Sequence, residues 1–503
     1  MRNLPPAALL PDPHICEQAR RSRDARFDGL FFTAVSSTGI YCRPVCPAPA
    51  AKRSNVQYYA NAAAAEAAGF RPCLRCRPEL APGNELWRHG DHVVARALKL
   101  IADGALAEQS VAQLAARVGI GARQLRRLFV QRVGVPPRNV YATHRLLFAK
   151  QLLTETALPV TEVALASGFR SLRRFNAAFA QANRIEPRQL RRTPRAARDA
   201  PLVLRLGYRP PYAFDAMLTF MRTRALAGVE VVDARSYARA FGTPEALGWL
   251  RLSAWPDGAH ALRLQLHCPQ PTQLLGVVTR LRRMFDLDAN PLLIAQTFAS
   301  DPLLGPLCDR CPGLRVPGSW NGFEIAVRAV LGQQISVAAA RTLAARIVQR
   351  YGERLPEPPL PGLERLFPTP AVLANADLGA LGLTTTRAAT VRTLAQALLD
   401  GRVDFRAEQS LEEFVTRWTA LPGIGRWTAH YIALRVQGDP DAFPAADLIL
   451  RRKAASDGPP LTERALLARA AAWRPWRAYA VMHLWRASAH PPAPKIIHPR
   501  RSR

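Results

Sequence analysis

The chain has 503 residues and carries 69 lysines and arginines against 38 acidic residues, a formal net charge of +31. The length predicts roughly three or four domains, and an apolar content of 49% excludes wholesale disorder. No uninterrupted apolar run reaches the ~18 residues of a transmembrane helix, and the N-terminus has no signal-peptide core, so we expect a cytoplasmic protein. Such a charge needs an anionic partner: nucleic acid first, an anionic membrane surface second. The dominance of arginine over lysine favours nucleic acid, although codon bias would produce it as well.

The first predicted feature in chain order is a metal site built by four of the eight cysteines. Cys42-x3-Cys46 and Cys73-x2-Cys76 are two close pairs that can converge on one tetrahedral ion, and four thiolates suit Zn²⁺. Two disulfides are the alternative, which a reducing compartment disfavours. We expect a strand over 27–35 and an alanine-rich helix over 61–68 beside the pairs. The arginines expected next to the thiolates are Arg43, Arg71, Arg75 and Arg77. The separate pair Cys308-x2-Cys311 is interpreted as structural.

The stretch from about 27 to 80 resembles the N-terminal zinc domain of Ada-type DNA repair regulators. The resemblance rests on the run Thr38-Gly39-Ile40-Tyr41-Cys42-Arg43-Pro44-Val45-Cys46. It implies one zinc ion held by Cys42, Cys46, Cys73 and Cys76, and irreversible transfer of a methyl group from a DNA methylphosphotriester to Cys42. A zinc-bound thiolate stays ionised and nucleophilic at neutral pH. Its methylation removes one negative charge, which would strengthen binding to DNA phosphates and so act as a switch.

Residues 85–195 show a helical pattern with the same design twice. A short helix from Ser110, a turn at Gly119 and an arginine-rich second helix recur about 50 residues later around Gly168, and a long helix over 137–155 joins the two units. Each unit is a helix-turn-helix. The residues that can face a major groove are Arg123, Arg126, Arg127, Arg173, Arg174 and Asn176; a solvated helix face is the alternative for each arginine. The tandem resembles the AraC-type DNA-binding domain, which follows the zinc domain in Ada-type proteins.

A linker over 191–201 leads into a mixed α/β segment and then, after about residue 300, into an all-helical one. Residues 202–206 and 262–266 alternate like half-exposed strands. Leu421 to Ala429 is a short hairpin between helices, in which Gly423 and Gly425 let the backbone approach a phosphate. Such a helix-hairpin-helix grips the DNA backbone without reading its sequence. Asp447 follows 22 residues beyond Gly425.

From about 202 to 487 the chain resembles AlkA-type 3-methyladenine DNA glycosylases of the helix-hairpin-helix superfamily. The shared stretches are 210–212, 331–334, 351–355, 421–429 and 473–477. The resemblance implies that Asp447 is the catalytic carboxylate, which stabilises an oxocarbenium ion once the damaged base has been flipped out of the duplex. It also implies an aromatic pocket for the cationic base, formed by Phe220, Trp427, Tyr431 and Trp485. The alternatives are a helix N-cap for Asp447 and ordinary core packing for the four rings.

Differences from related proteins refine this interpretation. Trp427 occupies the position where strand-cleaving glycosylases carry a Schiff-base lysine, so we expect base excision only. The wedge that fills the gap left by the flipped base is apolar in the family and matches the polar Gln334 here, which leaves the efficiency of flipping open. The C-terminal cysteines of an iron–sulfur cluster are missing and no Pro-Cys-His-Arg motif occurs. We therefore expect neither such a cluster nor repair of O6-methylguanine.

The sequence thus predicts a multidomain, mainly α protein with α+β parts. We expect a zinc-binding α+β domain over 1–82, an all-α double helix-turn-helix domain over 85–195, an AlkA-type N-terminal α+β domain over 202–310, an all-α glycosylase domain over 311–487 and a basic tail over 488–503. The expected function is a methylphosphotriester-sensing transcriptional activator fused to a monofunctional glycosylase for alkylated purines.

The expected partners are double-stranded DNA, at alkylated sites and at a promoter, and RNA polymerase; we expect no membrane partner and a location at a bacterial nucleoid. Two alternatives remain for the function. In one, the protein is a transcription regulator whose glycosylase half binds DNA without catalysis. In the other, it is a glycosylase whose N-terminal half only targets it to DNA.

Overall fold

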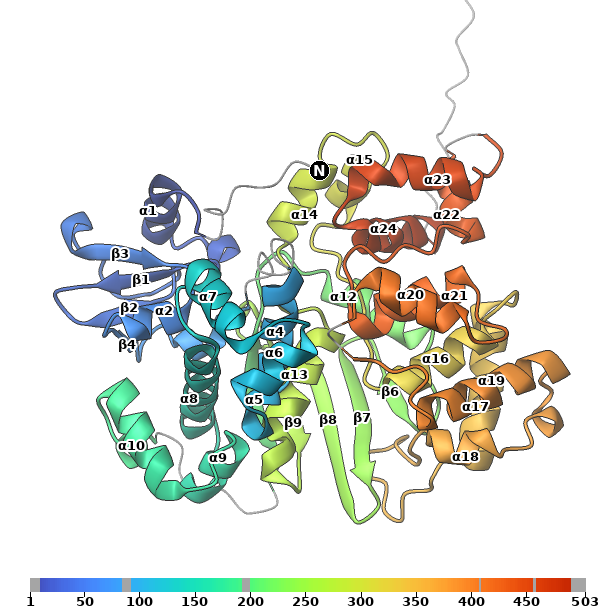
Figure 1. Cartoon of the computed structure of the whole chain (residues 1–503), viewed down its shortest axis with the longest axis horizontal. Helices are drawn as coiled ribbons and strands as arrows, with labels where there is room; N and C mark the ends of the chain where they lie inside the picture. Colours follow the sequence, from blue (N-terminus) through green and yellow to red (C-terminus); the bar gives the residue numbers. More distant parts are fainter. Residues whose placement is uncertain (1–9, 84–91, 192–199, 407–408, 456–457, 490–503) are drawn as a thin grey trace, which may run out of the picture.

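The computed structural model describes residues 10–83, 92–191, 200–406, 409–455 and 458–489. Four regions follow one another along the chain: a small α+β unit, a helical unit, an antiparallel sheet with flanking helices, and a large helical unit (Figure 1). The predicted fold class is confirmed. Most of the predicted linker and nearly all of the predicted tail lie outside the described residues.

The first unit is a small sheet with helices against it. Its elements are α1 (Pro13–Ser22), η1 (Ala25–Phe27), β1 (Phe32–Val35), β2 (Ile40–Cys42), η2 (Arg53–Asn55), β3 (Val56–Tyr59), α2 (Ala62–Ala67), β4 (Arg71–Pro72) and η3 (Pro78–Leu80). The strand order is β3-β1-β2-β4, with β1 antiparallel to both neighbours and β4 parallel to β2. The strand predicted over 27–35 starts only at Phe32, because 25–27 form a 3-10 turn capped by Asp24 and Gly29 adopts φ +75°.

The second unit contains both predicted helix-turn-helix pairs. Its helices are α4 (His92–Ala102), α5 (Ala105–Glu108), α6 (Val111–Arg117), α7 (Ala122–Val133), α8 (Pro137–Glu155), α9 (Val160–Ala166), α10 (Leu172–Asn183) and α11 (Pro187–Leu190). Ser110 caps α6 in a capping box with Gln113, and Gly119, at φ +79°, makes the turn before α7. Helix α8 spans the predicted residues 137–155 and separates α7 from α10, the second helices of the two pairs (Figure 1).

The third unit is a five-stranded antiparallel sheet in the order β5-β9-β8-β7-β6, with helices against it. Its elements are β5 (Leu202–Gly207), α12 (Phe214–Arg222), β6 (Glu230–Val232), β7 (Ser236–Thr243), β8 (Ala246–Ala254), β9 (Ala261–His267), η4 (Pro271–Gln273), α13 (Leu274–Met284) and α14 (Pro291–Phe298). The two strands predicted over 202–206 and 262–266 pair with each other as β5 and β9.

The fourth unit is helical over its described residues, as predicted. Its elements are α15 (Leu304–Arg310), α16 (Gly322–Leu331), α17 (Val337–Tyr351), α18 (Pro370–Ala374), η5 (Gly379–Leu381), α19 (Thr385–Leu399), α20 (Leu411–Thr419), α21 (Arg426–Ile432), the π-helical turn η6 (Ala433–Gln437), α22 (Leu448–Lys453), α23 (Glu463–Arg469), η7 (Ala470–Trp473) and α24 (Arg477–Ala489). Within the described ranges, no helix is both long and apolar enough to cross a bilayer.

The hydrophobic core does not follow the unit boundaries. One large cluster fills the fourth unit and extends into the third, where it includes Leu226, Ile294 and Phe298. Another runs from the helices of the second unit into the sheet of the third, so that Leu152, Phe175 and Phe179 belong to the same cluster as Leu204 and Leu264. The second and third units therefore share one core, and the chain is not a string of independent modules.

Candidate active site and metal centre

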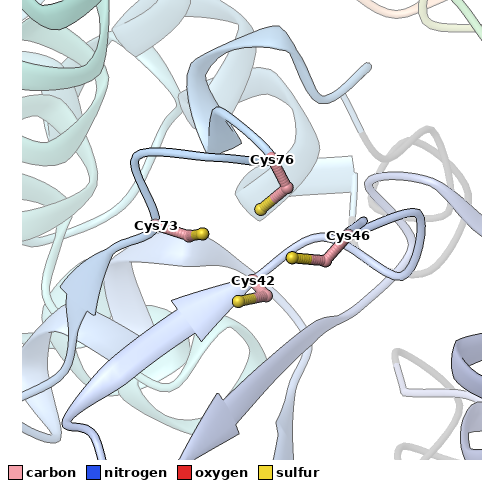
Figure 2. Close-up of side chains that lie close together, drawn as sticks. All are labelled: Cys42, Cys46, Cys73 and Cys76. Atoms are coloured by element: carbon pink, nitrogen blue, oxygen red, sulfur yellow. The ribbon is translucent and has the colours of Figure 1, made fainter. Parts of the chain in front are cut away.

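The four predicted cysteines converge, although they come from segments about 30 residues apart. Cys42 ends β2, Cys46 lies in the loop after it, and Cys73 and Cys76 lie in the loop between β4 and η3 (Figure 2). The parallel pairing of β2 and β4 brings the two loops together. All four Sγ atoms lie within 4.8 Å of one another. Four sulfurs around one tetrahedral zinc ion would be separated by roughly 3.8 Å, so this donor set fits Zn²⁺.

The four cysteines differ in the exposure of the whole residue. Cys73 and Cys76 are buried, whereas Cys42 and Cys46 are partly exposed. The backbone N–H of Arg43 donates to Cys76 Sγ over 3.3 Å, which helps to hold negative charge on that sulfur.

The arginines around the cluster divide into two kinds, which the sequence did not distinguish. Arg43 is turned inward, where its Nε donates to Asp28 over 2.9 Å and its Nη1 to the Cys76 carbonyl over 3.0 Å. Arg77 forms ion pairs with Glu79 and Glu155. Of the four arginines expected beside the thiolates, Arg75 is the one that is exposed, and Arg71 is half-buried. Arg43 and Arg77 hold the structure together and are not free to meet DNA.

Cysteines outside the cluster lie in apolar surroundings. Burial raises the pKa of the Cys16 and Cys308 thiols to about 12, so both stay protonated and unreactive. Cys308 Sγ lies 3.4 Å from Nε2 of the buried His483. The structural interpretation of Cys308 is consistent with this packing.

The predicted groove-facing residues all lie on one side of the second helices. Leu125 and Phe129 of α7, and Phe175 and Phe179 of α10, are fully buried in the cores. Every predicted residue of the opposite faces is exposed: Arg123, Arg126, Arg127, Arg173, Arg174 and Asn176. Exposure fits contact with a groove and equally fits a solvated face.

The predicted hairpin lies between α20 and α21, and a second loop is tied to it. Gly423 adopts φ +82° against Thr390, where a Cβ would overlap the threonine hydroxyl, and Gly425 is the N-cap of α21. In the loop between α16 and α17, Gln333 Nε2 donates to the Gly423 carbonyl over 2.9 Å and to Thr428 Oγ1 over 3.0 Å. The next residue, Gln334, is exposed and held at φ +58°. Gln333 thus fixes the predicted wedge relative to the hairpin.

Asp447 has two structural roles at once. Its Oδ1 accepts from the amides of Ile449 and Leu450 and caps α22, so the N-cap alternative is correct as a description of this oxygen. Its Oδ2 accepts a 3.0 Å hydrogen bond from Nε1 of Trp427. The helix thereby fixes the carboxylate, and Oδ2 lies beside the aromatic group.

The four predicted pocket residues are half-buried and lie next to one another at the edge of the core. The Trp427 and Tyr431 rings stack at a centroid distance of 5.5 Å with an interplanar angle of 15°, and Trp485 lies 6.1 Å from Tyr431. Phe220 joins this group through Arg435, whose guanidinium lies 5.0 Å from the Phe220 centroid and 5.8 Å from that of Tyr431. The rings are partly exposed, and Phe220, Tyr431 and Trp485 also pack against the core, so the arrangement fits a pocket lining and equally fits core packing.

Two further arginines belong to this site, although no motif in the sequence indicates them. Arg435 Nη1 donates to the Tyr431 hydroxyl over 2.9 Å, and Arg224 lies 3.8 Å from the Phe220 ring centroid. Burial favours a raised pKa for Tyr431, but Arg435, Arg224 and Arg328 outweigh it and lower that pKa. The signal available in the sequence was spacing: Trp427, Tyr431 and Arg435 follow one another at intervals of four residues, on one helix face.

Family models match four successive parts of the chain. They are described as "Metal binding domain of Ada" (residues 15–79), "Helix-turn-helix domain" (114–193), "AlkA N-terminal domain" (203–321) and "HhH-GPD superfamily base excision DNA repair protein" (327–478). The order of the matches agrees with the order of motifs read from the sequence.

Individual proteins match both the whole chain and its second half. A "Probable bifunctional transcriptional activator/DNA repair enzyme AlkA" of Mycobacterium tuberculosis is 40% identical over 482 residues, 95% of this chain and 96% of that protein. "DNA-3-methyladenine glycosylase 2" of Escherichia coli is 38% identical over 285 residues, 56% of this chain and 95% of that protein. Among solved structures, the 3-methyladenine DNA-glycosylase from Archaeoglobus fulgidus covers 57% of this chain and 98% of its own, with a TM-score of 0.50 and 23% identity, which shows a shared fold.

Proposed function

Because the chain belongs to the family of bifunctional transcriptional activator and DNA repair enzymes of the AlkA type, we propose that its two halves act on alkylated DNA by different chemistries. It is a DNA glycosylase fused to an Ada-type zinc domain and a DNA-binding helix-turn-helix domain. The residues assigned to each step below are part of the proposal.

In the N-terminal half, Cys42 accepts a methyl group from a methylphosphotriester. The partial exposure of Cys42 supports this choice over the buried Cys73 and Cys76, and its place in the motif shared with Ada-type zinc domains supports it over Cys46. A Zn²⁺ ion at the cluster would keep the thiols ionised at neutral pH. The Cys42 sulfur forms a bond to the methyl carbon, the carbon–oxygen bond breaks, and its electron pair stays on the phosphate oxygen. The products are a thioether on Cys42 and a phosphodiester that has regained its charge.

In the C-terminal half, Asp447 assists hydrolysis of the bond between sugar and damaged base. The bond breaks with its electron pair on the departing base, and the positive sugar is stabilised by the carboxylate before water adds. The observation that carries this assignment is the placement of Asp447 Oδ2 against Trp427, beside the other pocket rings. The aromatic group of Phe220, Trp427, Tyr431 and Trp485 would hold the flipped alkylated purine, and no side-chain amine is needed for excision alone.

The remaining assignments concern metal, domains and partners. We infer one zinc ion, held by the four clustered cysteines, and no iron–sulfur cluster. The domain boundaries are 1–82, 85–195, 202–310 and 311–487, followed by the basic tail. DNA contacts come from the exposed faces of α7 and α10, from Gln334 as wedge and from Gly423 and Gly425 at the backbone. We also infer action at the bacterial nucleoid and RNA polymerase as a further partner.

The deciding experiment is a base-release assay on alkylated duplex DNA with full-length protein. Wild type should release 3-methyladenine, and Asp447→Asn should not, while both bind the duplex equally. Asparagine is as good an N-cap as aspartate, so this variant keeps α22. Asp233→Asn, at a remote carboxylate that accepts from the amides of Arg235 and Ser236, is the matched control. Release by Asp447→Asn at the wild-type rate would remove Asp447 from the mechanism, and no release by wild type would favour a glycosylase half that only binds.

A further inference from the structure

We propose that a metal ion at the Cys42, Cys46, Cys73 and Cys76 cluster stabilises the glycosylase half, because the loops that hold the cluster also fix strand β5 of that half. The proposal concerns the contact between the two halves and needs neither methyl transfer nor base excision. It rests on three sets of contacts between segments that lie 50 to 181 residues apart.

The first set is centred on Arg209, which follows β5 and is fully buried. Its guanidinium donates to the carbonyls of Asp28 (2.8 Å) and Gly83 on the N-terminal side, and to those of Asp288 and Ala289 (3.0 Å) on the glycosylase side. One buried cation thus satisfies four carbonyls from two halves. A buried guanidinium that lost these acceptors would be strongly unfavourable, so the side chain fixes the two halves in one arrangement.

Asp28 connects that arginine to the cysteine cluster. Its backbone oxygen accepts from Arg209, and its carboxylate accepts from Arg43. Arg43 follows Cys42 in the chain, and its amide and guanidinium bind the sulfur and the carbonyl of Cys76. Two residues, Arg43 and Asp28, therefore separate the metal ligands from the buried Arg209. Any loosening of the loop between Cys42 and Cys46 acts directly on the position of Asp28.

The second set passes through helix α8. The buried Lys150 pairs with Glu79 and donates to the Cys73 carbonyl over 3.3 Å. Five residues further along, Glu155 pairs with Arg77 and accepts from the backbone amide of Arg205, in the middle of β5, over 3.0 Å. β5 is an edge strand of its sheet, so its outer backbone groups need partners from outside the sheet. Helix α8 supplies them at Arg205, whose amide donates to Glu155 and whose carbonyl accepts from Gln151 over 2.8 Å.

The third set is one close contact between two backbones, which leaves no room for a side chain. Gly207, the last residue of β5, lies directly against the backbone carbonyl of Leu80 in η3, which begins two residues after Cys76. A Cβ at position 207 would overlap that oxygen. Here glycine is required by the approach of the two backbones. The turn η3, which follows the cysteine loop, and the first strand of the glycosylase half are therefore in direct contact.

These three sets of contacts couple metal binding to the stability of the glycosylase half. An ion bound by four thiolates stabilises the loops of its ligands, because those loops order around it. Since Asp28 binds Arg209 just after β5, Arg77 binds Glu155 and Leu80 lies against Gly207, part of that stabilisation reaches the glycosylase half. Removing the metal should increase opening of β5 without unfolding the large helical unit, whose helix α19 (Thr385–Leu399) takes part in none of the three sets of contacts.

Hydrogen exchange with full-length protein tests the proposal. Zinc content is measured first, and exchange is then compared before and after removal of zinc with a chelator, and again after zinc is restored. We expect exchange in β5 (Leu202–Gly207) to become about tenfold faster on chelation and to recover with zinc, while α19 (Thr385–Leu399) stays unchanged. Faster exchange confined to residues 71–77, with β5 unaffected, would overturn the proposal.

Two variants and a control test the junction itself. Arg209→Met and Gly207→Ala should both speed exchange in β5 while zinc content stays at the wild-type level, and chelation should then add little. Arg205→Met is the matched control on the same strand, because its side chain contacts Trp255 and Asp257 in the loop between β8 and β9 and takes no part in the three sets of contacts. It should respond to chelation as wild type does. A protein that holds no zinc would contradict the metal assignment, whereas slow β5 exchange in Arg209→Met and Gly207→Ala would contradict the junction.

Discussion

The indole Nε1 of Trp427 donates a 3.0 Å hydrogen bond to Oδ2 of Asp447. The other carboxylate oxygen is already used by the first turn of α22. The indole therefore determines the direction of the one oxygen that remains for chemistry. Trp427 is also the first ring of the aromatic group, so one side chain would contact the base and hold the carboxylate.

Trp427→Phe should separate these two roles. The ring face remains, but the donor is lost, and a hydrogen bond to a charged group is worth roughly 1.5–3 kcal/mol. We expect single-turnover release of 3-methyladenine to slow by about tenfold or more, with little change in DNA affinity. Unchanged release would mean that the indole N–H has no part in positioning Asp447.

Gln334 offers a test of base flipping. Gln334 is exposed, with φ +58°, and its loop is hydrogen-bonded to the hairpin through Gln333. The backbone position from which its side chain extends is therefore fixed. Gln334→Ala should slow excision from duplex DNA and leave excision from single-stranded DNA unchanged, because only the duplex needs its gap filled. Gln334→Leu should restore or exceed wild-type duplex activity. Equal duplex and single-strand effects would exclude a wedge role.

The cysteine assignments predict a graded reaction with a thiol-specific reagent. Metal-bound thiolates react, whereas burial raises the pKa of Cys16 and Cys308 to about 12 and keeps them protonated. Native protein should release one equivalent of zinc as Cys42, Cys46, Cys73 and Cys76 are modified, with Cys16 and Cys308 unmodified until unfolding. Mass mapping after incubation with methylphosphotriester DNA should place the methyl group on Cys42. A methyl group on Cys46 would correct the choice between the two exposed sulfurs.

His483 predicts a loss of stability in acid. Burial, with a contribution from Arg486, lowers the pKa of His483 to about 4, against about 6.5 in an unfolded chain. The folded state therefore holds the neutral form, and its contribution is complete above about pH 6.5 and lost as pH falls toward 4. The free energy of unfolding should fall by up to roughly 3 kcal/mol across that range from this group. His430, whose pKa burial also lowers to about 4, adds in the same direction.

Chemical denaturation at pH 7 and pH 4.5 measures this effect. His483→Gln cannot take up the buried proton, so its stability should depend less on pH than that of wild type. A variant that loses as much stability as wild type on acidification would show that His483 does not contribute.

The features that the sequence predicted are those set by local spacing. The two cysteine pairs, the capped helix at Ser110, the helix over 137–155 and the glycine hairpin each depend on residues within a few turns of one another. The inward orientation of Arg43 and Arg77 could not be predicted from local spacing, because tertiary packing determines which groups the two side chains bind. Arg209 and Asp28 are 181 residues apart, and neither hydrophobic periodicity nor motif spacing carries information over that distance.

The cluster shared by helices α8–α10 and the five-stranded sheet has a practical consequence for expression of either half alone. A fragment that begins at residue 200 would leave the apolar side chains that pack beside α8 without cover. Exposed apolar surface of that kind promotes aggregation, so low solubility of such a fragment would say nothing about its catalytic competence. By the same reasoning, replacing one half with a stand-alone homologue would require changes in that homologue. Its polar surface residues would have to become apolar where it packs against the other half. The shared cluster thus makes the surface of each half in this chain depend on the presence of the other.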